Sequence, residues 1–304
     1  MHVPVLLQPT IELLDIKEGE IVVDATLGLA GHAKVMAGKI GKEGTLIAFD
    51  ADAKLLAKAK KNLEFAKCRQ IFINTNFRHI KSALEKEGIR AVDKVLFDLG
   101  LNSEQFENSG RGFTFQKDEP LLMTLASEIE KDTLTAKEIV NTWAEESLAD
   151  IIYGYGEERL ARRIAKAIIE AREKKEIETT FDLVEVIRQA VPVFYTKKKT
   201  HFATKTFQAL RITVNDEIGA LREGLTGAWE KLSDGGRVAV LSFHSLESRT
   251  VKEFFKDKVM AGEGKLINKK VIKPSREEEL ANPRSRSAQL RVASRLSSRQ
   301  ALKI

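Results

Sequence analysis

The segment Ile21–Ala37, IVVDATLGLAGHAKVMA, decides the fold class of this chain. An apolar run ends in Asp24, glycines follow at Gly28 and Gly31, and the residues after them have the composition of a helix. Glycines directly after a strand let a ligand approach backbone that a Cβ atom would block. The segment therefore predicts a nucleotide-type ligand where the first strand of an α/β sheet turns into a helix.

Strand and helix patterns alternate over the first hundred residues. Runs rich in Val, Ile and Leu predict strands at EIVVDA, TLIAFD, QIFIN and VDKVLFDLG, and helical patterns separate them, one beginning at Asp52. Such strands separated by helices are typical of a parallel sheet that is covered on both faces. The fold class is therefore α/β, with a Rossmann-like sheet.

A mainly helical insertion interrupts this pattern, and we place it at residues 104–199. Its helices include ERLARRIAKAIIEA and TFDLVEVIRQAV, the second after a threonine cap signal. The apolar spacing from Phe207 to Leu232 predicts one long helix, RVAVLSFHS predicts a fifth strand, and GKLINKKVIKPS with AQLRVASRL predicts a closing hairpin. The sheet domain is thus expected to comprise residues 1–103 and 200–304.

Composition limits the class of protein and its partners. The net charge of +6 favours an anionic partner. No apolar run approaches the roughly 18 residues of a membrane span, and the start MHVPVLLQPT lacks the features of a secretion signal, so we expect a cytoplasmic protein without a membrane partner. Cys68 is the single cysteine and the five histidines are scattered, so no disulfide and no metal site are expected. A homodimer is one candidate state.

Three ligand classes use a glycine turn of this kind. The P-loop pattern is absent, and the dinucleotide pattern G-x-G-x-x-G is incomplete because Ala30 stands between the two glycines. S-adenosylmethionine carries a sulfonium cation and no phosphate, so it tolerates the nearby Asp24. Asp50, at the end of the second strand, could accept both ribose hydroxyls of either cofactor. A nicotinamide-dependent oxidoreductase therefore remains an alternative on these residues.

The fourth strand ends in FDLGLNSEQ, which brings a third acid to the same place. Ligands of open α/β sheets bind beyond the carboxyl ends of the strands. Asp98 is thus expected in the same crevice as Asp24 and Asp50, with Asn102 and Gln105 on the following loop. The alternative role for Asp98 is that of a turn residue.

Several longer motifs occur in a fixed order along almost the whole chain. They are HVPVLL, DATLGLAGH, FDLGLNSEQ, RGFTF, YGEERLARRIA, FATKTFQALRITVNDEI, GGRVAVLSFHSLESRTVKEFF and NPRSRSAQLR. Together, from about His2 to Arg291, they resemble the bacterial small-subunit rRNA (cytosine-N4)-methyltransferase family. The resemblance implies a class I methyltransferase sheet with an inserted substrate-recognition domain, and S-adenosylmethionine-dependent methylation of the N4 amine of cytosine 1402 in 16S rRNA of the small ribosomal subunit.

The resemblance also implies site residues. The cofactor positions of the family fall on Ala30, Gly31, His32, Asp50, Phe77, Asp98 and Gln105. For the target amine, we hypothesise that Asp98 and Asn102 accept its hydrogens, with His244 of SFHS as a second candidate. In the alternative assignment of roles, Asp98 binds only the cofactor and does not contact the amine.

Further residues are candidates for contact with RNA. Stacking on the extruded base is one role for Phe113, Phe115 and Phe243, although each also suits a core. The candidates for phosphate contacts are Arg111, Lys197–Lys199 and Arg284–Arg291.

The chain departs from the family pattern in four places, which include the loop DLGLNS at residues 98–103 and the segment HFATK at residues 201–205. The turn lacks the arginine that usually follows its first glycine, and DEPLLMTLA at residues 118–126 lacks two acids and an arginine. Two alternatives therefore stay open: a catalytically weakened RNA-binding or ribosome-assembly factor on the same fold, and a methyltransferase with a different nucleic-acid target.

Overall fold

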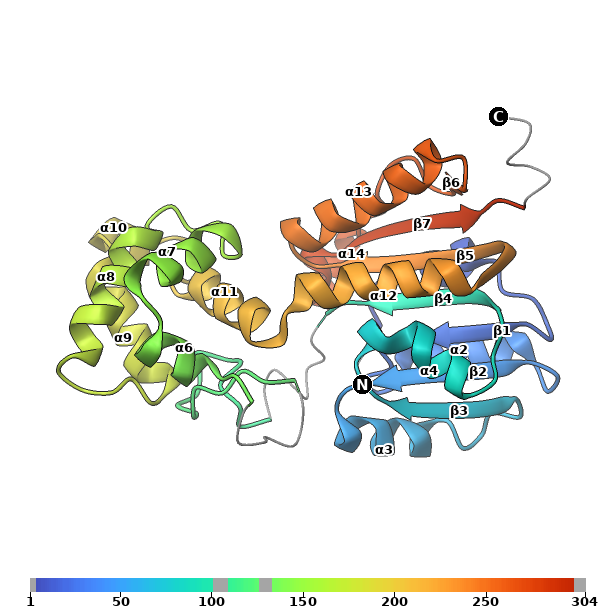
Figure 1. Ribbon diagram of the computed structural model, residues 1–304, viewed down its shortest axis with the longest axis horizontal. Helices are drawn as coiled ribbons and strands as arrows, with labels where there is room; N and C mark the ends of the chain where they lie inside the picture. Colours follow the sequence, from blue (N-terminus) through green and yellow to red (C-terminus); the bar gives the residue numbers. More distant parts are fainter. Residues whose placement is uncertain (1–3, 101–108, 126–132, 298–304) are drawn as a thin grey trace. The chain divides into compact units, whose positions relative to one another are not determined.

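The chain forms two compact units. The computed structural model describes residues 4–100, 109–125 and 133–297 (Figure 1). The first compact unit, which we call the sheet unit, comprises Met1–Gly100 and Ile218–Ile304. The second, which we call the helical unit, comprises Leu101–Glu217. The sequence predicted a return to the sheet at residue 200. The structure differs because the helix around Phe207 and Leu210 packs into the core of the helical unit.

A seven-stranded sheet organises the first unit. The strands are β1 (Ile21–Asp24), β2 (Thr45–Asp50), β3 (Arg69–Asn74), β4 (Val92–Asp98), β5 (Leu232–Ser242), β6 (Gly264–Leu266) and β7 (Gln289–Arg295). Their order is β3-β2-β1-β4-β5-β7-β6; the first five are parallel, and β7 runs antiparallel to both neighbours. The predicted strands, the parallel sheet and the closing β6–β7 hairpin are confirmed.

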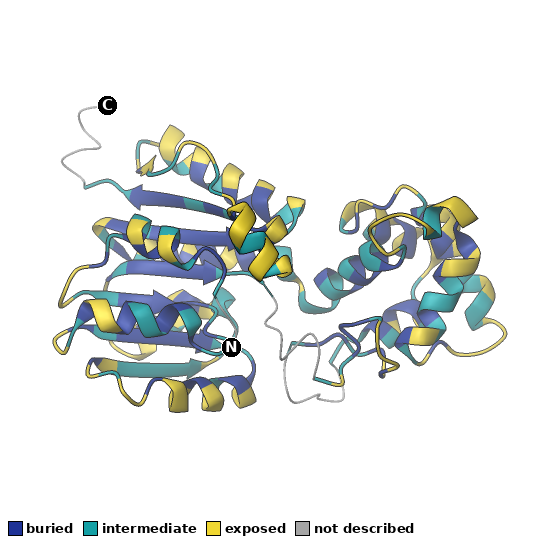
Figure 2. Cartoon of the chain, turned by 180° about the vertical axis from the view of Figure 1, so that it is seen from behind, coloured by how far each residue is buried: buried dark blue, intermediate teal, exposed yellow. Residues whose placement is uncertain are grey.

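Helices cover both faces of this sheet. The helices of one face are α1 (Leu7–Leu14), α2 (Gly31–Ile40) and α3 (Ala53–Asn62), and those of the other are α4 (Ile80–Lys86), α12 (Glu217–Lys231) and α13 (Ser245–Met260). Neighbouring strand residues such as Val22 and Val23 belong to the two opposite cores, as the pleat of a strand requires. The central strands are accordingly mostly buried, and the outer helix surfaces are exposed (Figure 2). This is the doubly wound α/β arrangement.

The strand order reverses between β1 and β4. From β1 the chain builds outward to β2 and β3, then returns to place β4 on the other side of β1. The connections on the two sides of such a switch point diverge, which leaves a crevice beyond the carboxyl ends of the two strands. Asp24 ends β1 and Asp98 ends β4, so both residues lie at this point.

The helical unit has its own core. Its helices are α6 (Ala136–Thr142), α7 (Glu145–Gly154), α8 (Ala161–Arg172), α9 (Thr180–Ala190), α10 (Val193–Thr196) and α11 (Thr204–Asn215). Ile164 and Ile168 of α8 are fully buried in this core, and Thr179 caps α9 through a reciprocal capping box with Asp182. Over the described ranges, no helix combines the length and the apolar character that crossing a bilayer requires.

The predicted long helix from Phe207 to Leu232 is two helices. Asp216 adopts a left-handed conformation with φ of 44°, which ends α11 before α12 begins. Arg211 donates two hydrogen bonds to Glu217 across this break, at 2.7 and 2.9 Å. The prediction was wrong because the apolar spacing continues through the break and no glycine or proline marks it.

The segment that departs from the family pattern, residues 118–126, is described up to Leu125 and is part of the helical core. Thr124, which stands in place of the family's arginine, is buried, and Leu125 packs against this core. The carboxylate of Glu119 accepts the N–H of Gly112 at 2.9 Å, and Thr180 N–H donates to the Glu119 carbonyl at 2.9 Å. The changed residues therefore pack and connect the helical unit.

Candidate active site

Three aspartates gather at the carboxyl edge of the sheet. Asp24, Asp50 and Asp98 end β1, β2 and β4, which are neighbours in the sheet. Asp24 lies close enough to both others for their charges to act on it. The structure thus brings together the three acids that the sequence singled out.

Asp50 holds the glycine turn in place. Its Oδ2 accepts the N–H of Gly28 at 2.9 Å, and its Oδ1 accepts the N–H of Asp52 at 2.9 Å. Gly28 has a φ of 53° and Ala30, the N-cap of α2, has a φ of 66°. The left-handed region suits glycine but strains alanine, so the turn carries strain at Ala30.

The chain's first described residues cover the start of α2. A Cβ atom on Gly31 would lie 2.5 Å from Pro4 Cγ, so Gly31 admits the proline ring. The Val5 carbonyl lies 3.1 Å from Nε2 of His32. The observed role of Gly31 is therefore close packing, and its contact with a cofactor stays a prediction.

His32 links this segment to Asp98. Its side chain is buried, and its Nδ1 lies 3.4 Å from Asp98 Oδ2. Burial alone would lower the pKa of His32, but the hydrogen bond and charge of Asp98, together with Asp24, raise it above the ordinary value. The side chain of His32 therefore orients Asp98 and favours a cationic imidazole beside the acids.

Asp24 is a buried acid among other acids. Its pKa is raised to about 7, chiefly by burial and also by the charges of Asp98 and Asp50, whereas His32 and the Thr26 N–H act to lower it. Its Oδ1 accepts that N–H at 3.1 Å. Ionising Asp24 is thus coupled to the charge state of the whole site.

Thr26 is a site residue that the sequence reasoning missed. Its hydroxyl oxygen accepts the N–H of Asp98 at 2.6 Å, which ties the end of β4 to the residue that follows β1. A hydroxyl two residues after a strand-terminal acid, in DATLG, was the available signal.

The two carboxylate oxygens of Asp98 differ in their hydrogen-bond partners. Its Oδ2 faces His32, whereas Oδ1 is buried and has no hydrogen-bond partner among the residues that the structure describes. A buried acceptor without a donor is costly. Asp98 Oδ1 is therefore placed to accept a donor supplied by a ligand.

His244 occupies a capping position. It is the N-cap of α13; its Nδ1 accepts the N–H of Glu247 at 3.4 Å, and its Nε2 lies 3.1 Å from the same residue's carboxylate. His244 thus has a structural role at the start of α13. A catalytic role for His244 stays a prediction.

Phe77 packs within the sheet unit. Its ring meets Phe97 edge to face at 5.5 Å, and a Cβ on Gly224 would lie only 2.7 Å from it. The side chain is half-buried, so one part of it remains available to a cofactor. The other two predicted site residues, Asn102 and Gln105, lie outside the described residues.

The candidate stacking aromatics belong to packed surroundings. Phe113 is buried in the helical core, where the stacking prediction is wrong, and Phe115 stacks on His201 at 4.4 Å. Phe243 packs against Gly100, where a Cβ would lie 2.8 Å from the ring.

Comparison with known proteins decides the family. Residues 1–296 match the MraW methylase family. The chain belongs to this family. It is therefore a methyltransferase, and the oxidoreductase alternative is excluded.

Full-length relatives agree with this assignment. The chain is 43% identical to ribosomal RNA small subunit methyltransferase H of Streptococcus mutans serotype c, covering 97% of this chain and 98% of that protein. It is 42% identical to the protein of the same name from Brevibacillus brevis, again over 97% and 98%. An rRNA methylase structure from Streptococcus thermophilus matches with a TM-score of 0.45 at 12% identity, covering 98% of this chain and 99% of that one.

Proposed function

We propose that this chain transfers the methyl group of S-adenosylmethionine to the exocyclic N4 amine of cytosine 1402 in 16S rRNA. The observation that carries the proposal is the buried Oδ1 of Asp98 at the switch point of the sheet, which has no hydrogen-bond partner among the described residues. It offers a hydrogen-bond acceptor where an amine must be aligned.

The site suits a sulfonium cofactor. Asp50 and Asp98 supply negative charge at one sheet edge, and Asp24 adds to it when it ionises, which favours a cation and disfavours a pyrophosphate. A carboxylate has about four acceptor positions, so Asp50 can hold the turn and also accept ribose hydroxyls. Ala30 and Gly31 bring backbone to the same edge, and Phe77 offers part of a ring.

When bound, S-adenosylmethionine supplies an electrophilic methyl group. A cytosine amine is a weak nucleophile because its lone pair is delocalised into the ring, so alignment is the main task of the site. Asp98 Oδ1 accepts one amine hydrogen and turns the lone pair toward the methyl carbon. With the methyl group transferred to the nitrogen and S-adenosylhomocysteine as the leaving product, Asp98 would take up the amine proton and release it to solvent. His32 keeps Asp98 oriented throughout.

The RNA target rests on the relatives and on charge. Proteins of 42–43% identity carry the name ribosomal RNA small subunit methyltransferase H, and the net charge of +6 suits RNA. Since the acids of the site are all present, a binding-only factor is not favoured. The target places the enzyme in the cytoplasm. The candidate homodimer stays a prediction, which sedimentation velocity tests.

The test is methyl transfer from labelled S-adenosylmethionine to small ribosomal subunits that lack this modification. We expect the label in N4-methylcytidine at the decoding site, identified by mass spectrometry of nucleosides and of RNA fragments. Tight cofactor binding without label on rRNA would overturn the substrate assignment.

A further inference from the structure

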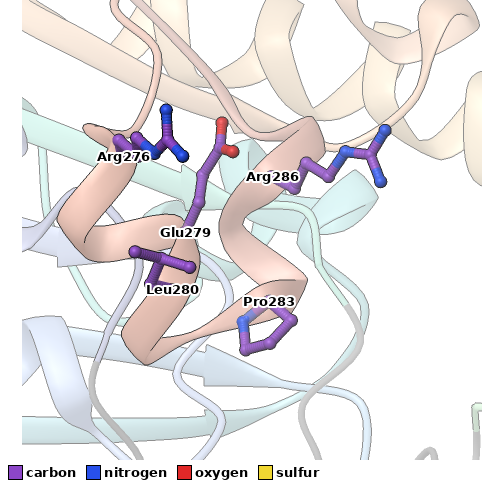
Figure 3. Close-up of a pocket in the computed structure, with 5 residues that line it drawn as sticks. All are labelled: Arg276, Glu279, Leu280, Pro283 and Arg286. Atoms are coloured by element: carbon purple, nitrogen blue, oxygen red, sulfur yellow. The ribbon is translucent and has the colours of Figure 1, made fainter.

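A hollow lies near the carboxyl ends of the parallel strands, in the segment that connects β6 to β7. Helix α14 (Arg276–Ala281) and the 3-10 helix η2 (Pro283–Ser287) enclose an open hollow of about 520 Å³. Its lining residues are Arg276, Glu279, Leu280, Pro283 and Arg286 (Figure 3). Two arginines, one glutamate and two apolar residues thus line one space, with the arginines on opposite sides of it.

The arginines that line this hollow have no carboxylate partner within the described part of the chain. Neither Arg276 nor Arg286 forms an ion pair with a carboxylate there, although Glu279 lies beside them. Leu280 is 75% exposed. Between Lys269 and Arg291 the chain has seven basic and three acidic residues, so the surroundings are also positive. Unpaired arginines beside an exposed leucine fit a ligand with both anionic and apolar parts.

A short series of contacts connects the hollow to the active site. Glu278 of α14 accepts the N–H of Leu6 at 2.7 Å. The preceding residue, Val5, contacts His32, which contacts Asp98. In addition, η2 leads into β7, whose first residue, Gln289, pairs with Ser242 at the carboxyl end of β5. All of these residues belong to the sheet unit.

We propose that this hollow binds the RNA strand next to the target cytosine. The proposal rests on the proposed function and names a substrate subsite for it. Arg276 and Arg286 contact phosphates, Leu280 packs against a ribose or base, and Glu279 accepts a hydrogen from a 2′-hydroxyl or a base amine. A free phosphate would leave Leu280 and Glu279 without a role. Holding the strand here keeps the extruded base near Asp98.

The test compares two double variants with equal loss of charge. Arg276→Gln/Arg286→Gln removes the proposed contacts. Lys42→Gln/Lys86→Gln is the matched control, because both lysines are exposed near the opposite edge of the sheet, before β2 and at the end of α4. Binding of a labelled decoding-region RNA fragment is measured by fluorescence anisotropy over a range of KCl concentrations, with S-adenosylhomocysteine present.

We expect the arginine variant to bind RNA about tenfold more weakly than the control. Its plot of log affinity against log salt should lose about 1.4 in slope, since each phosphate contact on a single strand contributes about 0.7. Leu280→Ala should weaken binding severalfold without changing the slope. The affinity for S-adenosylhomocysteine should stay at the wild-type value in all variants.

Three results would count against the claims in different ways. An arginine variant that matches the control in affinity and slope overturns the subsite. So does a loss of binding seen only with intact small subunits and not with naked RNA, which would assign the hollow to a ribosomal protein. A wild-type protein that methylates no rRNA overturns the proposed function instead, and this is measured separately.

Discussion

Buried charges are compensated near the amino ends of the strands but only partly compensated at the carboxyl ends. Near the amino edge, Lys94 is 6% exposed and pairs with Glu20 at 3.0 Å. Asp93 accepts the Ile21 N–H at 2.9 Å and the Ser233 hydroxyl at 2.7 Å. At the carboxyl edge, three acids meet one histidine, and Asp98 retains an acceptor without a donor.

This contrast separates structural charges from functional ones. Charge that stabilises a fold is matched by opposite charge or by donors. Charge that serves a ligand is concentrated and left partly unmatched, at a cost in stability. Leu6 and Ala30 at this edge have positive φ values, and so does Asp15 near the amino edge. Four substitutions test the contrast, in order of decreasing expected effect.

Asp98→Asn should have the largest effect. We expect the rate of methyl transfer at saturating substrates to fall about 100-fold or more, because the amide is a poor proton acceptor. Binding of S-adenosylhomocysteine, measured by calorimetry, should change less than about threefold if Asp98 serves the amine. Asp93→Asn, on the same strand, is the matched control and should retain activity. A parallel loss of cofactor affinity would assign Asp98 to the cofactor.

Lys94→Met tests the ion pair near the amino ends of the strands. Removing the ammonium leaves Glu20 without its partner in a mostly buried position, so the free energy of unfolding should fall by about 2–3 kcal/mol in urea titrations. Affinity for S-adenosylhomocysteine should not change. The double variant Lys94→Met/Glu20→Gln should recover part of the loss. Intact stability in the single variant would contradict a structural role for the pair.

Asp24→Asn tests the group of acids at the carboxyl ends of the strands through the dependence of stability on pH. The pKa of Asp24 is about 7 in the folded state, against an ordinary value of 3.8. The raised pKa favours folding below about pH 4, and this contribution is lost as the pH rises through 7. Asparagine keeps the acceptor for Thr26 but cannot ionise.

The stability of Asp24→Asn relative to wild type should therefore grow by about 2 kcal/mol between pH 5 and pH 8. Thermal or urea unfolding at several pH values measures this difference. Asp234→Asn, which alters an exposed carboxylate, is the control. A difference that does not change with pH would mean that burial does not keep Asp24 protonated.

Ala30→Gly should show the smallest effect. Ala30 and Ala33 are both fully buried, but only Ala30 has a positive φ. Both substitutions lose one buried methyl group, whereas only Ala30→Gly relieves left-handed strain. We expect Ala30→Gly to be about 1–2 kcal/mol more stable than Ala33→Gly in urea unfolding. Equal stabilities would show that the turn carries no strain at Ala30.

Much of the sheet unit was predictable because its patterns are local. The strands are short apolar runs, and the first helix of the pattern begins at Gly31 as expected. The three acids could be placed together because the carboxyl ends of parallel strands share an edge. The helix break at Asp216 could not be predicted, because asparagine and aspartate adopt the left-handed region far less readily than glycine and the apolar spacing continues past them. Nor did the sequence indicate α1, whose first turn contains Pro9.

The contacts within the site depended on residues far apart in the chain. His32 was expected to touch a cofactor, yet its side chain spans Val5 and Asp98. Periodicity along a strand or helix carries no information about such a contact. The hydroxyl of Thr26 and the carbonyl of Val5 were missed for the same reason: the sequence shows which groups are present, and the fold decides which of them meet.

The hydrogen bond from Leu6 to Glu278 joins residues near the two ends of the chain. A ribosome makes the chain from its N-terminus, so β1, β2 and the glycine turn emerge long before α14 and β7. Until then, β5 has an open side and Leu6 lacks its acceptor. Completion of this part of the sheet unit must therefore await the synthesis of α14 and β7.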